Sequence, residues 1–277
     1  MRTFLKTMIG GVAALLSAAA AAQTVTINVA SFPDLDRGIK LAIPLYTKLH
    51  PNVEIKLTSL AYADHHTAMT TALATGSNLP DVMAVDMGFI GKFAESGGLE
   101  DLSKAPYNAL QFRDKVARFT YPLAMSGQGV MVGMPVDIGP GALFYRKDLL
   151  DKAGVGEAEL TRSWESYIEA GRKLKAATGA WLLASAVDIK DIYIRSDLKD
   201  GEGVYFDKSG KPTIDNARFR KAFELAKAAR EAGIDGKIGA WSNEWSEGFK
   251  RDKIASQMMG AWLAGHLNNW LAPESKG

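Results

Sequence analysis

The sequence of 277 residues contains no cysteine. Disulfide bonds are therefore excluded, and a chain of this length can bury enough apolar surface to fold without them, even in an oxidising compartment. The same absence excludes a lipid attached to cysteine. We therefore expect a protein that is not a lipoprotein.

The chain also lacks a strong net charge, since 33 basic residues oppose 31 acidic ones. Two of the basic residues, Arg2 and Lys6, lie in an N-terminal segment that we expect to be removed, which leaves 31 of each sign. Nucleic-acid binding requires a net basic surface. The composition thus argues against a nucleic-acid partner.

Long apolar runs are absent except near the N-terminus. There Arg2 and Lys6 precede an apolar run, Met8 to Leu16, and then small residues, Ala18 to Ala22. This order is typical of a cleavable secretory signal, and the run is short for a membrane span. We expect residues 1–22 to be a signal peptide and the mature chain to enter the periplasm.

Motifs for catalysis and metal binding are missing as well. No Gly-x-Ser-x-Gly is present, and no glycine-rich phosphate loop follows a predicted strand. His65 and His66 are adjacent, so on a helix they point about 100° apart and cannot share a metal ion. We expect no catalytic residue, no metal and no cofactor. Two acids that meet only in space would still permit glycoside hydrolysis, which leaves a glycosidase-like enzyme as the alternative.

The first half of the chain alternates strand and helix patterns. The predicted strands are 24–30, 53–58 and 82–85, and the predicted helices are 39–49, with Pro44 inside it, 62–75 and 88–95. This order predicts a parallel sheet covered by helices, and such sheets bind ligands at the carboxyl ends of their strands.

Three loops follow these strands, and each carries an acid and an aromatic residue. Asp36 and Arg37 lie on the first loop and Asp86 on the third. On the second loop, Asp64 is expected to cap a helix rather than to bind. The loops therefore predict a row of hydrogen-bond acceptors beside aromatic rings.

A central stretch separates the two halves. A β-rich run, 130–136, leads to Asp137, the segment Gly139-Pro140-Gly141 and an apolar run, 142–145. Proline and glycine here suit a chain that passes from one packed body to another, although an ordinary loop between two strands fits equally well. We accordingly expect lobes at 23–137 and 138–277.

The second half is mostly helical by pattern. We expect helices at 147–153, 163–178, 216–232 and 244–251, a hairpin tip at 205–214 and a strand at 254–259, with 181–186 either strand or helix start.

All six tryptophans lie in the second half. Trp164 is expected in the core, whereas Trp241 and Trp245 stand one helical turn apart. Trp262 lies between glycines after a predicted strand, which favours a ring that faces a cleft. Flat rings stack on the C–H faces of sugars, and carboxylates accept hydrogen bonds from sugar hydroxyls.

Four stretches carry a family resemblance: 75–82, 93–99, 135–154 and 260–262, with lesser matches at 207–213 and 241–245. The chain resembles extracellular solute-binding proteins of family 1, the sugar receptors of ABC importers related to maltose- and trehalose-binding proteins. The resemblance implies an α/β, periplasmic-binding-protein-like fold of type II, with two lobes of parallel sheets flanked by helices.

The resemblance also implies a function. A neutral mono- or oligosaccharide would bind between the lobes and pass to a membrane permease, and the receptor would be a monomer. Carried over by position, the ligand-binding residues are Asp36, Arg37, Asp86, Asp137, Trp241 and Trp262.

The chain departs from the family at its end. It stops at Gly277, soon after the strand that precedes Trp262, whereas relatives continue and return through the hinge. We therefore expect a C-terminally truncated second lobe, from a fragment or a shortened product, and a chain that fails to bind is a further alternative. Uncovered strand edges and apolar helix faces would promote aggregation.

Overall fold

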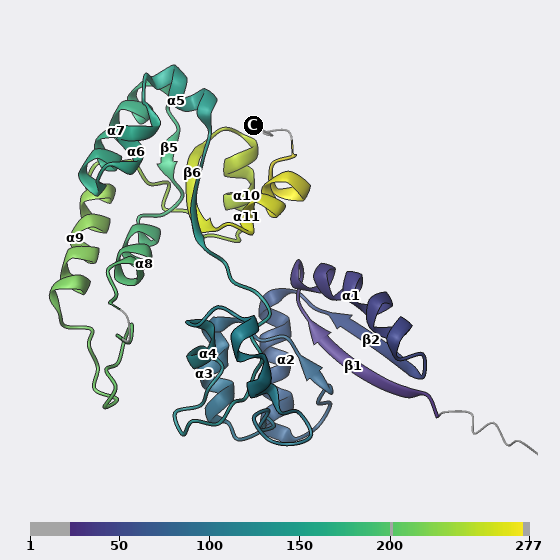
Figure 1. Cartoon of the computed structure of the whole chain (residues 1–277). Helices are drawn as coiled ribbons and strands as arrows, with labels where there is room; N and C mark the ends of the chain where they lie inside the picture. Colours follow the sequence, from purple (N-terminus) through teal and green to yellow (C-terminus); the bar gives the residue numbers. More distant parts are fainter. Residues whose placement is uncertain (1–22, 200–201, 274–277) are drawn as a thin grey trace, which may run out of the picture. The chain divides into compact units, whose positions relative to one another are not determined.

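The structure, a computed structural model, describes residues 23–199 and 202–273 (Figure 1). The predicted signal peptide lies outside the described residues. Contacts divide the chain into unit 1, which ends at Asp137, and unit 2, which begins at Ile138. Each unit has its own sheet and core, and we describe each by itself.

Unit 1 contains a wholly parallel three-stranded sheet in the order β2-β1-β3. Its strands are β1 (Val25–Ser31), β2 (Val53–Ser59) and β3 (Val82–Met83). Its helices are α1 (Leu35–Leu49), α2 (Tyr62–Thr75), α3 (Met87–Glu95), the 3₁₀ helix η1 (Ala109–Lys115) and α4 (Thr120–Leu123). The predicted alternation of strand and helix is confirmed, although β3 is two residues shorter than expected.

The helices of unit 1 follow the expected local signals with two exceptions. Helix α2 ends at Gly76, whose φ of 65° is the left-handed cap that glycine favours. Asp64 does not cap α2, because the N-cap is Ala61 and Asp64 lies inside the first turn. On α1, which contains Pro44, the side chain of Leu49 is 76% exposed, so the end of its apolar face is not buried in unit 1.

The predicted strand at 130–136 is wrong. Only Met131 pairs, in an isolated bridge with Met125, and Val136 is 77% exposed. Gly133 and Pro135 explain the difference, because glycine weakens a strand and proline cannot donate to a ladder. The segment is an extended connection that leaves unit 1.

Unit 2 is built on a mixed three-stranded sheet in the order β4-β6-β5. Its strands are β4 (Gly141–Tyr145), β5 (Trp181–Leu183) and β6 (Ile254–Gly260). Strands β5 and β6 are parallel, as the fold class predicts, whereas β4 runs antiparallel to β6. Strand β4 therefore lies at an edge of this sheet and is the segment through which the chain enters the unit.

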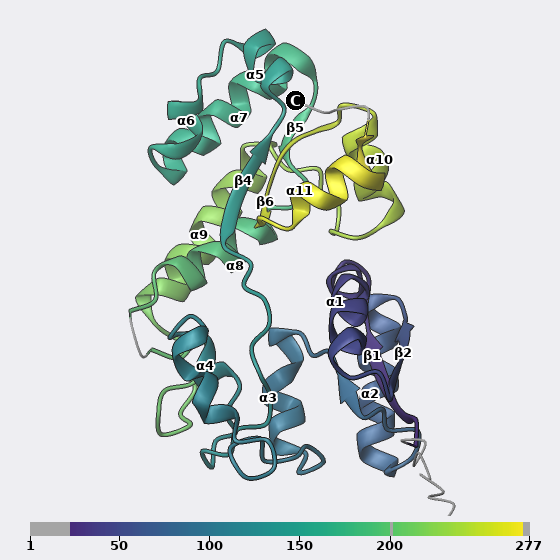
Figure 2. The same ribbon diagram turned by 45° about the vertical axis from the view of Figure 1, so that its right-hand side comes forward.

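Helices pack around this sheet, and α8 and α9 lie side by side (Figures 1 and 2). They are α5 (Lys147–Ala153), α6 (Glu157–Thr161), α7 (Trp164–Thr178), α8 (Val187–Ser196), α9 (Ala217–Glu231), α10 (Asn243–Lys250), α11 (Leu263–His266) and the π-helical turn η2 (Leu267–Leu271). The predicted helices at 147–153, 163–178, 216–232 and 244–251 are confirmed.

Local chemistry explains where these helices start. The side chains of Ser163, Asn216 and Ser242 each accept a hydrogen bond from the backbone N–H three residues on. Such N-caps each contribute about 1 kcal/mol. The largest core lies between α7, α9 and β5, where Leu174 and Leu182 are fully buried. Within the described residues, we find no helix with the length and apolar content to cross a bilayer.

Candidate ligand-binding surfaces

Two tryptophan rings of unit 2 stack on each other. The centroids of Trp241 and Trp262 are 5.8 Å apart, and the ring planes differ by 20°. Trp241 is 52% exposed and Trp262 42% exposed, so both indoles reach the surface. We call these two residues the tryptophan platform. A broad, flat and partly exposed apolar surface of this kind suits the C–H face of a sugar ring.

His266 completes the platform from α11. Its ring lies edge-on to both indoles, at 5.3 Å from Trp241 and 5.4 Å from Trp262. It follows Trp262 by four residues, and its Nδ1 lies 3.3 Å from the carbonyl oxygen of Trp262. This histidine was not predicted from the sequence, although its spacing of four from Trp262 was the available signal.

Close approach of the backbone seats the Trp262 ring. A Cβ atom added at Gly260 would lie 2.2 Å from the Nε1 of Trp262, and one added at Gly139 would lie 2.9 Å from the same atom. The two segments are held together because the N–H of Ala261 donates to the carbonyl of Pro140 at 2.8 Å. The glycine and proline residues of the central stretch therefore make room for the indole.

A row of three hydrogen-bonded side chains, Trp245, Gln257 and Asp188, lies beneath the platform. Trp245 is fully buried, its centroid lies 5.0 Å from that of Trp241, and its Nε1 donates to Gln257 at 3.0 Å. Gln257 in turn donates from Nε2 to Asp188 at 2.7 Å. Burial raises the pKa of Asp188, against the lowering effect of the Gln257 hydrogen bond. These hydrogen bonds fix Trp245 under the exposed rings.

Trp241 differs from its sequence interpretation. It precedes Ser242, the N-cap of α10, and its φ of 68° places it outside the helix. Trp241 and Trp245 are therefore not successive turns of one helix. Of these three tryptophans, Trp262 and Trp241 share the exposed surface, and Trp245 supports them from below.

In unit 1 the three loops after the strands bring their aromatic rings together, as predicted for the carboxyl edge of a parallel sheet. The centroid of Tyr62 lies 5.4 Å from that of Phe32 and 6.1 Å from that of Phe89. His65 and His66 lie within the same cluster, each 1% exposed. Tyr62 is 46% exposed, which gives the cluster an accessible ring.

Asp86 lies at this edge as the N-cap of α3. Its Oδ1 accepts a hydrogen bond from the N–H of Gly88 at 2.8 Å, and its backbone N–H donates to Nε2 of His66 at 3.2 Å. Burial, together with the nearby charge of Asp86, raises the pKa of Tyr62 to about 12. We call Tyr62 and Asp86 the unit 1 acceptor pair, because the oxygens of both side chains can accept hydrogen bonds.

Asp36 and Arg37 have local partners. Asp36 is 7% exposed in the first turn of α1, and its Oδ2 accepts from Lys40 at 2.7 Å. Burial would raise the pKa of Asp36, but hydrogen bonds from Lys40 and Ser59 hold it below its usual range. Arg37 is exposed, with Nη1 at 3.8 Å from a carboxylate oxygen of Asp34. The partners of Asp36 therefore lie within its own unit, on α1 and β2.

Asp137 is exposed and is the last residue of unit 1. The six predicted residues therefore belong to two groups. Asp36, Arg37, Asp86 and Asp137 lie in unit 1, and Trp241 and Trp262 in unit 2. In unit 1 Asp86 lies beside the aromatic cluster that the three loops predicted, whereas in unit 2 Trp262 has a neighbour, His266, that the sequence did not predict.

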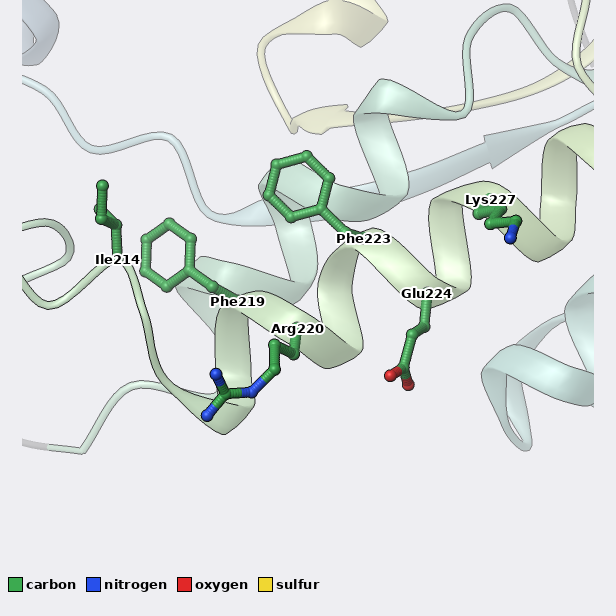
Figure 3. Close-up of a pocket in the computed structure, with 6 residues that line it drawn as sticks. All are labelled: Ile214, Phe219, Arg220, Phe223, Glu224 and Lys227. Carbon is green, nitrogen blue, oxygen red and sulfur yellow. The ribbon is translucent and has the colours of Figure 1, made fainter.

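A further hollow lies along α9 (Figure 3). It is lined by Ile214, Phe219, Arg220, Phe223, Glu224 and Lys227. None of the six predicted residues lies in it. Across residues 23–199 and 202–273 there is also no group of three or more His, Asp or Glu residues placed to hold a metal ion.

Known proteins share this architecture. A protein described as extracellular solute-binding protein family 1 superposes with a TM-score of 0.73 and 28% identity, over 91% of this chain and 65% of that one. An ABC transporter associated binding protein from B. animalis subsp. lactis, in complex with β-1,6-galactobiose, has a TM-score of 0.71, 23% identity and coverage of 91% and 60%. The fold is that of type II periplasmic binding proteins.

The chain belongs to the bacterial extracellular solute-binding protein family, whose model matches residues 30–275. A lactose-binding protein of Rhizobium radiobacter is 29% identical over 269 residues, which is 93% of this chain and 60% of the relative. The chain therefore spans less than two thirds of the length of these proteins. The family is one of exported solute-binding proteins.

Proposed function

We propose that this protein binds a neutral mono- or oligosaccharide and delivers it to the permease of an ABC importer. The tryptophan platform carries this proposal, because two stacked and half-exposed indoles offer an apolar face matched to a pyranose ring. The lactose-binding relative supports the same class of ligand.

The unit 1 acceptor pair is a second candidate contact for a sugar, and its groups are polar. Asp86 and Tyr62 lie at the carboxyl edge of a parallel sheet, where α/β proteins bind ligands. A carboxylate accepts hydrogen bonds from sugar hydroxyls but repels carboxylate or phosphate groups. This favours a neutral ligand.

Binding proceeds without chemistry in this proposal, and the protein is not an enzyme. Asp86 accepts a hydrogen bond from Gly88, and Asp36 accepts one from Lys40, so each acid is held as an acceptor by its own unit. We further propose that the chain is exported by cleavage after residue 22, acts as a monomer in the periplasm, and uses Arg37 and Asp137 as additional ligand contacts.

The test is a titration of the purified chain with lactose, galactose and β-1,6-galactobiose, followed by tryptophan fluorescence and by analysis of the sugar. We expect saturable quenching with unchanged sugar. Trp262→Ala should weaken binding at least about tenfold, because a central aromatic anchor contributes about 2 kcal/mol or more.

The matched variant in unit 1 is Asp86→Asn, since asparagine caps helices as well as aspartate and leaves α3 intact. It should weaken binding while leaving thermal stability near that of the parent. Trp164→Phe, in the core of unit 2 beside Tyr167, controls for general effects of losing an indole. Release of monosaccharide products, or quenching that Trp262→Ala leaves unchanged, would contradict the proposal.

A further inference from the structure

Hydrogen bonds determine the tautomer of His66, a buried residue of α2. Its Nδ1 lies 2.8 Å from the carbonyl oxygen of Tyr62, and its Nε2 lies 3.2 Å from the backbone nitrogen of Asp86. A carbonyl oxygen can only accept, and an amide N–H can only donate. The proton must therefore sit on Nδ1, with the lone pair of Nε2 directed at Asp86.

Ring contacts hold the imidazole in this orientation. It stacks on Phe89 of α3 with centroids 4.0 Å apart and planes 16° apart. It also lies 4.6 Å from Tyr62 and 5.3 Å from Phe32. A 180° ring flip would put Cδ2 in the place of Nδ1 and Cε1 in the place of Nε2, which would break both backbone hydrogen bonds.

His66 connects the two residues of the acceptor pair through their backbones. Its Nδ1 donates to the carbonyl of Tyr62, and its Nε2 accepts from the amide of Asp86. Because both backbones are bound to the same imidazole, the two side chains are held near each other. Their oxygens can then accept hydrogen bonds from a ligand.

We propose that His66 is a positioning residue for ligand binding: as the neutral Nδ1–H tautomer, it holds Tyr62 and Asp86 as one preformed pair of acceptors for sugar hydroxyls. This inference rests on the proposed function for its ligand, but its geometry can be tested without one.

His65 is the natural control. It lies on the same helix, is equally buried at 1% exposure, and donates from Nε2 to the carbonyl of Ala84 at 2.7 Å. That hydrogen bond involves neither Tyr62 nor Asp86. Replacing His65 thus removes a buried imidazole from the same core without removing the acceptor for the Asp86 amide.

The experiment compares the full chain with His66→Phe, His66→Gln and His65→Phe. Nitrogen-15 spectra of the imidazoles report the tautomer, hydrogen exchange reports the Asp86 amide, and titration with lactose reports affinity. We expect protonated Nδ1 and unprotonated Nε2 at His66 in the parent chain. In His66→Phe, Asp86 exchange should rise and lactose affinity fall at least about tenfold, the equivalent of one lost buried acceptor.

His66→Gln places an amide oxygen near the position of Nε2 and should recover part of both effects, whereas His65→Phe should change neither. A proton on Nε2 of His66 in the parent, or an Asp86 amide unaffected by His66→Phe, would overturn the inference. Failure of the parent to bind any of the three sugars would count against the proposed function, and the tautomer and exchange results would still decide the role of His66.

Discussion

At the scale of single residues, the strongest constraint on the tryptophan platform comes from glycine. Gly260 and Gly139 leave the space that the Trp262 indole fills, and the N–H of Ala261 ties the two segments together. The sequence indicated a cleft-facing tryptophan from its flanking glycines. It could not indicate that Gly139 lies against the same ring, because 123 positions in the chain separate the two.

Gly260→Ala should displace the Trp262 ring, since the new Cβ would lie 2.2 Å from Nε1. Overpacking of this kind costs about 1–3 kcal/mol of unfolding free energy, and we expect a matching loss of platform stacking. Urea unfolding and near-ultraviolet circular dichroism measure the two effects.

Gly141→Ala is the matched control, because nothing lies within 4 Å of its added Cβ. Its effect should stay within about 0.5 kcal/mol. Equal stability of the Gly260 and Gly141 variants, with unchanged aromatic dichroism, would show that the indole does not depend on this space.

At the scale of helices and strands, local signals predicted most of the fold. Capping residues such as Ser163 and Asn216, and glycine after α2, α5 and α7, mark helix ends through nearest-neighbour hydrogen bonds. Strand pairing could not be predicted in this way, because it depends on partners that are far apart in the sequence. The run 130–136 has strand-like residues but gains only one bridge, and β4 pairs antiparallel to β6 across more than 100 residues.

The hydrogen-bond partners of individual side chains could not be predicted from the sequence either. The alternation of β and α predicted that the loops bearing Phe32, Tyr62 and Asp86 would meet, and they do. It did not predict that Asp86 would cap α3 or that Asp36 would be buried beside Lys40. An acid at the start of a loop gives the same sequence pattern whether it caps a helix or binds a ligand.

Helix α2 makes the stability of unit 1 depend on pH through His65. Burial lowers the pKa of His65, and the nearby His66 acts in the same direction, against the hydrogen bond to Ala84. The Nδ1 of His65 is buried without a hydrogen-bond partner among the described residues. The folded state therefore resists protonation of His65.

The unfolded chain takes up a proton at His65 as the pH falls through about 6.5, the ordinary value for histidine, whereas the folded chain does not. This contribution to stability is complete above that pH and is lost as the pH falls towards the lower folded pKa. Urea unfolding of the parent at about pH 7.5 and about pH 5.5 should show the loss. His65→Gln should have a smaller difference between the two conditions, and an identical difference would exclude His65 as its source.

At the scale of the whole molecule, two units each present an aromatic surface and belong to one family of solute-binding proteins. Balanced charge, the lack of cysteine and the predicted signal peptide narrowed the class of protein before the structure was known. Unit 1 also carries an apolar surface that its own core does not use. On α1, Leu41 is 75% exposed, Leu45 69% and Leu49 76%.

These three leucines follow one another at intervals of four on α1 and form a continuous stripe. An exposed apolar stripe of this kind promotes association, so we expect the protein, which we propose to act as a monomer when dilute, to self-associate as its concentration rises. The triple variant Leu41→Gln, Leu45→Gln and Leu49→Gln should shift sedimentation towards the monomer with little change in unfolding midpoint, because side chains that are already exposed contribute little to folding.

Phe223→Gln, which alters a 59% exposed ring on α9 in unit 2, is the control for apolar exposure elsewhere. If the control suppresses association and the α1 variant does not, the adhesive surface lies in unit 2, and α1 is not its source.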